Sequence, residues 1–269
     1  MDLGLRGRAA LVGGSSSGLG LAIATRLAAE GARVAVNGRD RQRCERAVAG
    51  IRPGSGGEAF AFPGDVSDPA QATALVAAAR ERFGRLDILV CNAGGPPATT
   101  FADAPADAWQ KALELSLLST VHLCRAAVPL MRAGRWGRII CMTSFAALEP
   151  LPGLILSTTA RAGVIGFAKC LADEVARDGI LVTTVCPGYF RTDRVTDLAA
   201  ARAKREGTTV EAIQSRQIGG IPLARMGDPD ELADVVAFLA SDDARWLTGL
   251  TLPATGGLVT STTNILNKA

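Results

Sequence analysis

No apolar run in this 269-residue chain reaches the roughly 20 residues that a transmembrane helix requires. The first residues, MDLGLRGRAALVGG, lack a long apolar stretch before their glycines, so we expect no signal peptide. Net charge is only +3 at pH 7, and the basic runs are interleaved with apolar or acidic residues. This argues against nucleic acid or an anionic membrane as a partner. We therefore expect a cytoplasmic protein.

Metal-binding patterns are also missing. The chain has six cysteines but no Cys-x-x-Cys pair and no other metal-ligand spacing. The cysteines are Cys44, Cys91, Cys124, Cys141, Cys170 and Cys186. They fall in apolar or helical runs, so we expect them to be small buried side chains in a reducing compartment. The only histidine, His122, has no sequence neighbour that would orient it as a base, and no metal site is predicted.

What the chain does contain is a regular alternation of strands and helices. Seven short apolar runs predict buried strands: Ala9–Gly13, Arg33–Asn37, Ala59–Phe62, Leu86–Cys91, Gly137–Thr143, Leu181–Cys186 and Leu250–Pro253. Helical patterns cover Leu19–Ala29, Arg41–Ala49, Pro69–Phe83, Ala106–Arg132, Ser157–Arg177 and Pro229–Ala240. This order predicts a single doubly wound Rossmann domain of the α/β class, residues 1–269. Its parallel seven-stranded sheet would have helices on both faces.

One segment, residues 191–217, interrupts this alternation. It is polar, contains Gly207, and lies between a predicted strand and the Ile221-Pro222 step. An insertion at that point lies beyond the carboxyl end of a strand, where open α/β sheets bind ligands. We interpret it as a candidate substrate lid, although a peripheral helix without a function fits the pattern equally well.

A glycine-rich turn follows the first predicted strand and leads directly into the first helix. A diphosphate needs a tight turn, a close approach of the backbone, and amides at a helix N-terminus, and glycines permit the first two. The order strand, turn, helix, strand makes dinucleotide binding the favoured interpretation. The predicted contacts are Gly14, Ser16, Ser17, Gly18, Leu19 and Gly20.

The end of the second strand bears on the choice of dinucleotide. Where a domain that binds NAD places an acid for the ribose 2′-hydroxyl, this chain has Gly38 followed by Arg39. An arginine can bind a 2′-phosphate that a carboxylate would repel. We therefore expect NADP in preference to NAD, although Ser17 adds no second positive charge and Arg39 could simply face solvent.

Together with further motifs, this turn resembles the short-chain dehydrogenase/reductase family, and most of all its 3-oxoacyl-[acyl-carrier-protein] reductase-like members. The additional motifs span most of the chain: Asp65-Val66, Asn92-Ala93-Gly94, Pro187-Gly188 with Thr192, Ile221-Pro222, Arg225-Met226-Gly227 and Thr255-Gly256-Gly257. The resemblance implies that Asp65 and Val66 contact adenine and that Pro187, Gly188 and Thr192 contact the nicotinamide carboxamide. It also implies cofactor contacts for Asn92, Ala93 and Gly94.

The catalytic set departs from the family, which uses Asn, Ser, Tyr and Lys. Ser144 matches the family serine that binds the substrate carbonyl. The Tyr-x-x-x-Lys register falls on Ser157 and Arg161, and the helical Asn register on Ser116. A serine is a far weaker acid than a phenol, whose pKa is about 10. Arg161 can replace lysine as a ribose clamp and a positive charge but not as a base.

Tyr189, the only tyrosine, follows Pro187-Gly188 and is the best replacement acid by position, although an aromatic pocket wall is an equally open interpretation. We expect an NADP-dependent oxidoreductase that acts on a carbonyl/alcohol pair of a small molecule or an acyl thioester. A non-redox enzyme (isomerase, dehydratase or cyclase) and a non-catalytic NADP-binding protein are the alternatives. The resemblance also implies a homodimer or homotetramer.

Overall fold

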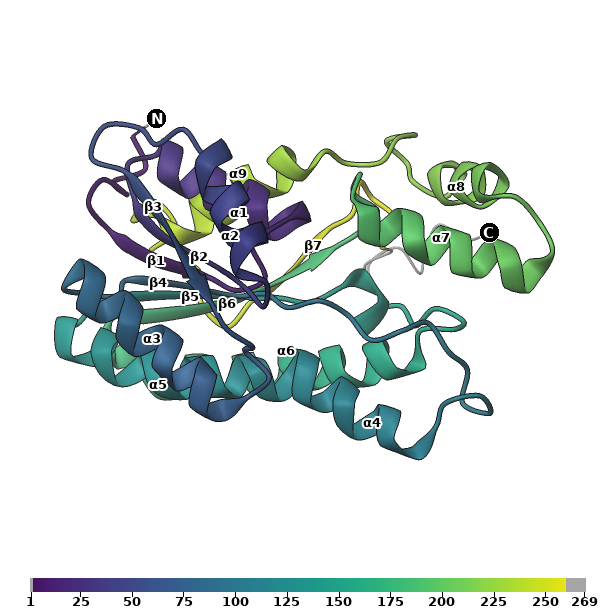
Figure 1. Ribbon diagram of the computed structural model, residues 1–269, viewed down its shortest axis with the longest axis horizontal. Coiled ribbons are helices and arrows are strands. Elements are labelled where there is room, and N and C mark those ends of the chain that lie inside the picture. The colour runs from purple at the N-terminus through teal and green to yellow at the C-terminus, as the bar shows by residue number, and fades with distance from the viewer. Residues whose placement is uncertain (1, 260–269) are drawn as a thin grey trace.

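The computed structural model describes residues 2–259, which form a parallel seven-stranded sheet covered by helices (Figure 1). Strand order is β3-β2-β1-β4-β5-β6-β7, and every neighbouring pair is parallel. The strands are β1 (Ala9–Val12), β2 (Arg33–Gly38), β3 (Glu58–Pro63), β4 (Ile88–Cys91), β5 (Gly137–Met142), β6 (Ile180–Pro187) and β7 (Thr251–Ala254). The predicted fold class is confirmed. The order reverses between β1 and β4, so ligands are expected at the carboxyl ends of these two strands.

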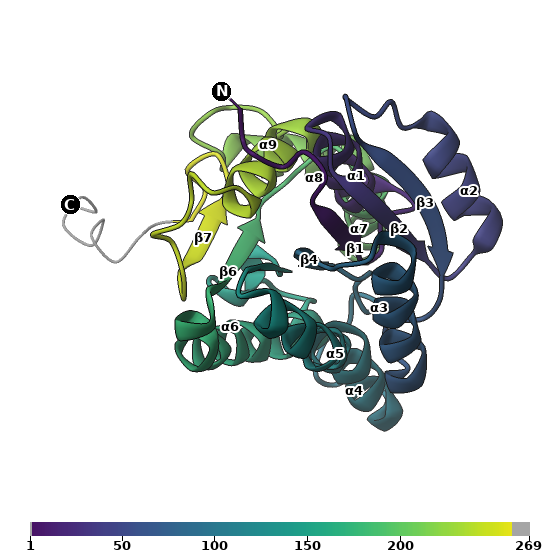
Figure 2. The same cartoon turned by 90° about the vertical axis from the view of Figure 1, so that its left-hand side faces the viewer.

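Helices cover both faces of the sheet (Figure 2), and a hydrophobic core lies beneath the helices on each face. One face carries α1 (Gly18–Ala29), α2 (Arg41–Gly50) and α9 (Pro229–Ala240); the other carries α3 (Pro69–Phe83), α5 (Ser119–Gly134) and α6 (Ile155–Val175). Successive side chains of a strand point to opposite faces. Ala10 and Val12 of β1 accordingly join the first core, and Ala9 and Leu11 the second. All four are buried because both faces are covered.

Helix Ala106–Arg132, predicted as one continuous element, is interrupted. It consists of α4 (Ala106–Leu113), a π-helical turn (Glu114–Leu118) and α5. A π turn adds one residue without breaking the helix. The apolar periodicity of the sequence therefore continues across it with little visible change.

By length and composition alone, two helical stretches could cross a membrane, Ala106–Gly134 and Ile155–Asp178. Each contributes buried side chains to the core beneath the sheet, among them Met131 and Val164. The core helices of a doubly wound sheet pack in this way, and 39% and 28% of the most apolar 18-residue windows of these two stretches are buried.

Five of the six cysteines are buried as predicted, but Cys170 is exposed, so the prediction was wrong at that position. Cys170 lies on the outer face of α6, where an apolar helical pattern does not distinguish a core-facing position from an exposed one. Cys91 and Cys124 lie in the second core with their sulfur atoms 3.8 Å apart.

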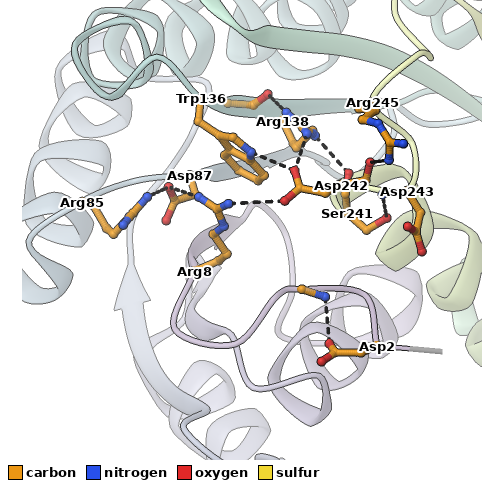
Figure 3. A network of polar contacts seen from close by, with 12 residues as sticks. Asp2, Arg8, Arg85, Asp87, Trp136, Arg138, Ser241, Asp242, Asp243 and Arg245 are labelled. Carbon is orange, nitrogen blue, oxygen red and sulfur yellow. Dashed lines mark hydrogen bonds and ion pairs between the residues drawn. The ribbon is translucent and has the colours of Figure 1, made fainter.

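A charged cluster closes the amino-terminal end of the sheet (Figure 3). The indole of Trp136 lies between two guanidinium groups, 3.7 Å from Arg8 and 4.1 Å from Arg138 measured to the ring centroid. Asp242 Oδ1 accepts hydrogen bonds of 3.0 Å from both Trp136 Nε1 and Arg138 Nη2. The Arg138 side chain is only 4% exposed. Within the described residues, Asp242 is the one carboxylate that pairs with it.

We expect Asp242→Asn to lower the free energy of unfolding by about 1 kcal/mol. The amide can still accept hydrogen bonds, but Arg138 loses its charged partner while it remains buried. Urea denaturation at low and high salt measures the effect, which should shrink as salt screens the exposed part of the pair. Asp243→Asn is the matched control, because the Asp243 carboxylate makes no hydrogen bond or ion pair with residues 2–259. Equal losses in the two variants would contradict this role.

Candidate active site

The glycine-rich turn occupies the point where the strand order reverses. It joins β1 to α1, and both Gly14 (φ +53°) and Gly18 (φ +56°) adopt the left-handed conformation that favours glycine. Asn92, just after β4, donates from Nδ2 to the carbonyl oxygens of Gly13 and Gly14 at 2.9 and 3.2 Å. A Cβ on Gly20 would lie 2.4 Å from the Gly14 oxygen, so the helix approaches the turn more closely than any other residue allows.

A buried pair that the sequence did not predict, Ser15 and Asn37, holds this turn against the end of β2. The backbone N–H of Asn37 donates to Ser15 Oγ (2.9 Å), and the backbone N–H of Ser15 donates to the backbone carbonyl oxygen of Asn37 (2.7 Å). The Asn37 side chain donates to the carbonyls of Phe62 and Gly64 and accepts from the Gly14 N–H. Asn37 therefore connects the turn, β2 and the end of β3.

A side chain larger than that of glycine at the end of β2 would contact two neighbouring side chains, which would have to shift. A Cβ on Gly38 would lie 2.8 Å from Ser16 Oγ and 3.0 Å from Cys44 Sγ. Arg39 is exposed. A second cation, Arg43 from the first turn of α2, contacts the glycine turn through its Nη2, 3.5 Å from Ser17 Oγ. The sequence prediction missed Arg43 because its proximity to Ser17 depends on how α2 is placed.

A cavity of about 330 Å³ opens beside the glycine turn, at the carboxyl ends of the strands. Among the predicted cofactor residues it is lined by Gly14, Ser17, Gly18, Leu19, Gly20, Asn92, Ala93, Gly94, Arg161, Pro187, Gly188 and Thr192. Among the predicted catalytic residues it is lined by Ser144, Ser157, Arg161 and Tyr189. The structure therefore brings both predicted groups into one space.

Ser144 and Ser157 present their hydroxyl groups in this cavity. Ser144 follows β5 and accepts a hydrogen bond from the Ala146 N–H at 3.2 Å. Ser157 lies in the first turn of α6, is 8% exposed, and accepts from Arg161 Nε at 3.2 Å. Each oxygen already accepts one hydrogen bond, so each hydroxyl proton is available to a ligand.

The guanidinium of Arg161 connects the loops that follow β4 and β5. Nη1 donates to the Thr143 carbonyl at 2.8 Å and Nη2 to the Gly94 carbonyl at 3.2 Å. Burial lowers the pKa of Arg161 to about 10, and the nearby positive charge of Arg194 acts in the same direction. Arg161 is therefore protonated at neutral pH. The hydrogen-bond partners of its Nη atoms are carbonyl oxygens rather than a carboxylate.

Tyr189 forms one wall of the cavity. Its ring packs edge-on against Phe145, with centroids 5.1 Å apart. Burial raises the pKa of Tyr189, and the smaller effects of the Arg202 charge and of the Gln217 side chain lower it. Both sequence interpretations of Tyr189, replacement acid and aromatic wall, are compatible with this position.

Five predicted site residues do not line the cavity: Ser16, Arg39, Asp65, Val66 and Ser116. The Asp65 carboxylate accepts from both the N–H and the hydroxyl of Ser67, at 2.9 and 2.6 Å, just before α3. Ser116 lies in the π-helical turn, and its hydroxyl is buried without a hydrogen-bond partner among residues 2–259.

The candidate lid, residues 191–217, contains α7 (Asp193–Glu206) and most of α8 (Val210–Gly219). The Thr192 side chain lies near the glycine turn, about 3.8 Å from a Cβ built on Gly18. One face of α7 lines the cavity through Arg194, Leu198, Arg202 and Arg205. Their spacing of four, four and three residues is the helical signal that would have found them in the sequence. Whether the segment moves as a lid stays a prediction.

Comparison with known proteins identifies the family. A protein-family model described as Enoyl-(Acyl carrier protein) reductase matches residues 14–259. The chain belongs to the short-chain dehydrogenase/reductase family. The family resemblance predicted from the sequence motifs is thus confirmed. Its relatives are oxidoreductases, and this chain is an oxidoreductase of the short-chain dehydrogenase/reductase type.

The relatives span nearly the whole chain. The 3-oxoacyl-[acyl-carrier-protein] reductase of Synechocystis sp. is 38% identical over 257 residues, 95% of this chain and 98% of that protein. D-beta-hydroxybutyrate dehydrogenase of Cupriavidus necator is 37% identical over 261 residues, 95% and 99%. The crystal structure of L-sorbose reductase from Gluconobacter frateurii, complexed with NADPH and L-sorbose, matches with a TM-score of 0.90 and 34% identity. The match covers 97% of this chain and 100% of the L-sorbose reductase chain.

We expect Asn37→Asp to lower the free energy of unfolding by about 3 kcal/mol, because it places a carboxylate, almost fully buried, against the carbonyls of Phe62 and Gly64. Denaturant unfolding followed by circular dichroism measures the loss. Ser16→Ala is the control and should stay within about 0.5 kcal/mol, since the Ser16 hydroxyl makes no hydrogen bond with residues 2–259. An Asn37→Asp variant as stable as the control would show that the turn does not depend on the amide.

Proposed function

We propose that this short-chain dehydrogenase/reductase is an NADP(H)-dependent oxidoreductase that interconverts a carbonyl compound and an alcohol, similar to 3-oxoacyl reductases. The observation that carries the proposal is the shared cavity. The glycine turn, Ser144, Ser157 and Arg161 all line it, so a dinucleotide and a carbonyl compound would meet there.

The cofactor proposal rests on the fit of the glycine turn and of the end of β2. Glycines give the turn its left-handed residues and its close packing on α1, and the amides that open α1 suit a diphosphate. Gly38 brings no carboxylate to the end of β2, and two cations, Arg39 and Arg43, lie at the same end. L-sorbose reductase, with a related structure, is complexed with NADPH. These features favour a 2′-phosphorylated dinucleotide.

The catalytic proposal assigns electrostatic work to the Ser/Arg pair that stands in place of Tyr and Lys. NADPH would supply the hydride, and Tyr189, which lines the same cavity, or solvent would supply the proton that completes the alcohol. The hydroxyls of Ser144 and Ser157 would donate to the substrate oxygen, and the Arg161 charge behind Ser157 would stabilise negative charge that develops there. Arg161 would also hold the nicotinamide ribose, which requires exchange of part of its bonding to Thr143 and Gly94.

The proposal extends to assembly. We propose a homodimer or homotetramer, with α5 and α6 between subunits. Support comes from the apolar length of these helices: only 28% of the most apolar 18-residue window in Ile155–Asp178 is buried within one subunit.

Removal of the positive charges near the end of β2 should change the cofactor preference. We expect Arg39→Gln and Arg43→Gln each to weaken NADPH binding about tenfold and to change NADH binding less than about twofold, because only NADPH has the phosphate. Calorimetry measures both affinities. Arg46→Gln is the control. Arg46 lies on α2 with Arg43, is exposed, and makes no hydrogen bond or ion pair with residues 2–259, so its substitution should change neither NADPH nor NADH affinity. Native protein that binds neither nucleotide would overturn the whole proposal.

The second experiment tests the chemistry. Arg161→Ala should lower both NADPH affinity and turnover about tenfold or more, while Arg161→Lys should restore binding more than turnover because the guanidinium fork is lost. NADPH absorbance is followed with a panel of ketones and 3-oxoacyl thioesters. Substrate conversion without loss of NADPH would favour an isomerase, dehydratase or cyclase. Binding without any conversion would favour a non-catalytic NADP-binding protein.

A further inference from the structure

The charges around the cavity are strongly unequal. Within the described residues, four guanidinium groups line it, and Asp193 is the one carboxylate among the lining residues. Arg161 is already assigned to the proposed reaction, and Arg194 donates to the Pro96 carbonyl at 2.6 Å beside the loop that follows β4. Two cations, Arg202 and Arg205, have no role in the proposed chemistry.

Arg202 and Arg205 lie at the end of the cavity that is remote from the dinucleotide turn. Helix α7 starts beside that turn and runs away from the sheet (Figure 1). At 1.5 Å per residue, Arg202 and Arg205 lie about 12 and 16 Å further along α7 than Arg194. Their neighbours belong to the substrate end: Arg202 lowers the pKa of Tyr189, and Arg205 lies over Gly153. The diphosphate therefore does not account for these two arginines.

The Arg205 side chain is exposed at the rim of the cavity, and it has no charged or hydrogen-bonding partner among the described residues. Its guanidinium makes no hydrogen bond or ion pair with residues 2–259, and a Cβ on Gly153 would lie 2.8 Å from its Nη1. The nearby Glu206 instead accepts from Arg202 Nε at 2.5 Å and pairs with Arg216 at 2.8 Å. Arg202 and Arg216 share the Glu206 carboxylate and Arg205 does not contact it, so the three guanidinium groups and one carboxylate leave an excess of two positive charges.

A second unsatisfied group faces the same space. Gln217 of α8 is 8% exposed and lines the cavity, and its Oε1 has no hydrogen-bond partner among residues 2–259. This oxygen is an acceptor, so it suits an N–H or O–H donor elsewhere on a ligand and not an anionic oxygen. Gly153, in turn, lies just before α6, whose first turn carries Ser157. The free cation and the proposed carbonyl site are therefore neighbours.

We infer that the substrate carries an anionic oxygen group, a carboxylate or a phosphate, which binds Arg205 and Arg202 while its carbonyl lies at Ser144 and Ser157. The inference rests on the proposed function for the location of the carbonyl. An arginine fork matches the paired oxygens of either anion. The apolar lining, including Leu151 and Leu198, would hold the carbon chain between the two polar ends.

Binding to the complex with NADP⁺ tests this without turnover, because the oxidised cofactor cannot reduce a ketone. Calorimetry at constant ionic strength compares acetoacetate with methyl acetoacetate, and dihydroxyacetone phosphate with dihydroxyacetone. We expect one charged member to bind about tenfold or more tightly than its neutral counterpart. The pair that shows the difference identifies the anion as carboxylate or phosphate.

Variants then locate the anion site. Arg205→Gln should remove most of the preference for the charged member, and Arg205→Lys should keep part of it. Lys204→Gln removes the same charge from an exposed neighbouring position of α7 that does not line the cavity, and should leave the preference unchanged. Equal binding of charged and neutral members to the native complex, or equal effects of Arg205→Gln and Lys204→Gln, would overturn the inference.

The same assays separate this inference from the proposed function. If NADPH oxidation is seen with neutral ketones and no charge preference exists, the anion site is wrong and the oxidoreductase stands. If the charge preference depends on Arg205 but no compound oxidises NADPH, the anion site stands and the redox proposal fails.

Discussion

The reciprocal hydrogen bonds between Ser15 and Asn37 are the interaction on which the candidate active site depends. A parallel sheet has no ladder bonds beyond the ends of its strands, so the turn after β1 needs some other attachment. The backbone of Asn37 provides it through Ser15. The side chain of Asn37, nearly fully buried, also accepts from the Gly14 N–H, and the side chain of Asn92 donates to the carbonyls of Gly13 and Gly14 on the other side of the turn. Both side chains use amide groups, which can donate and accept at once and bring no charge to a site where a diphosphate is expected.

Arg161 connects several parts of the candidate active site through one guanidinium group. An ammonium is a compact point charge, whereas the guanidinium has five donors in a plane and can reach several carbonyls. In this chain those donors join the loops after β4 and β5, and one also contacts Ser157. Ser157 and Arg161 therefore form a polar, well-connected centre. Its chemistry would depend on positioned donors and positive charge rather than on an acidic phenol.

The sheet and the glycine turn could be predicted from the sequence because both depend on local sequence patterns. Buried strands read as apolar runs, and the turn requires glycine at fixed offsets. The π-helical turn was missed because one added residue barely changes an apolar helical pattern. Asn37 and Arg43 were missed because their partners are distant in sequence and only the packing of β2 and α2 makes them neighbours. The arginine face of α7 was present as a periodicity, but the polar segment 191–217 is interpreted as a whole, as a candidate lid, and its composition does not distinguish the face toward the cavity from the face toward solvent.

The Trp136 cluster lies at the amino-terminal end of the strands, opposite the cavity. Its cation–π contacts and its bonds to Asp242 hold β1, β5 and the segment after α9 together without any group that faces a ligand. The interactions that stabilise the fold and the residues that would face a substrate therefore lie at opposite ends of the same sheet. Such a division gives the scaffold evolutionary latitude: residues that face the ligand can be exchanged while the interactions that secure the sheet stay intact.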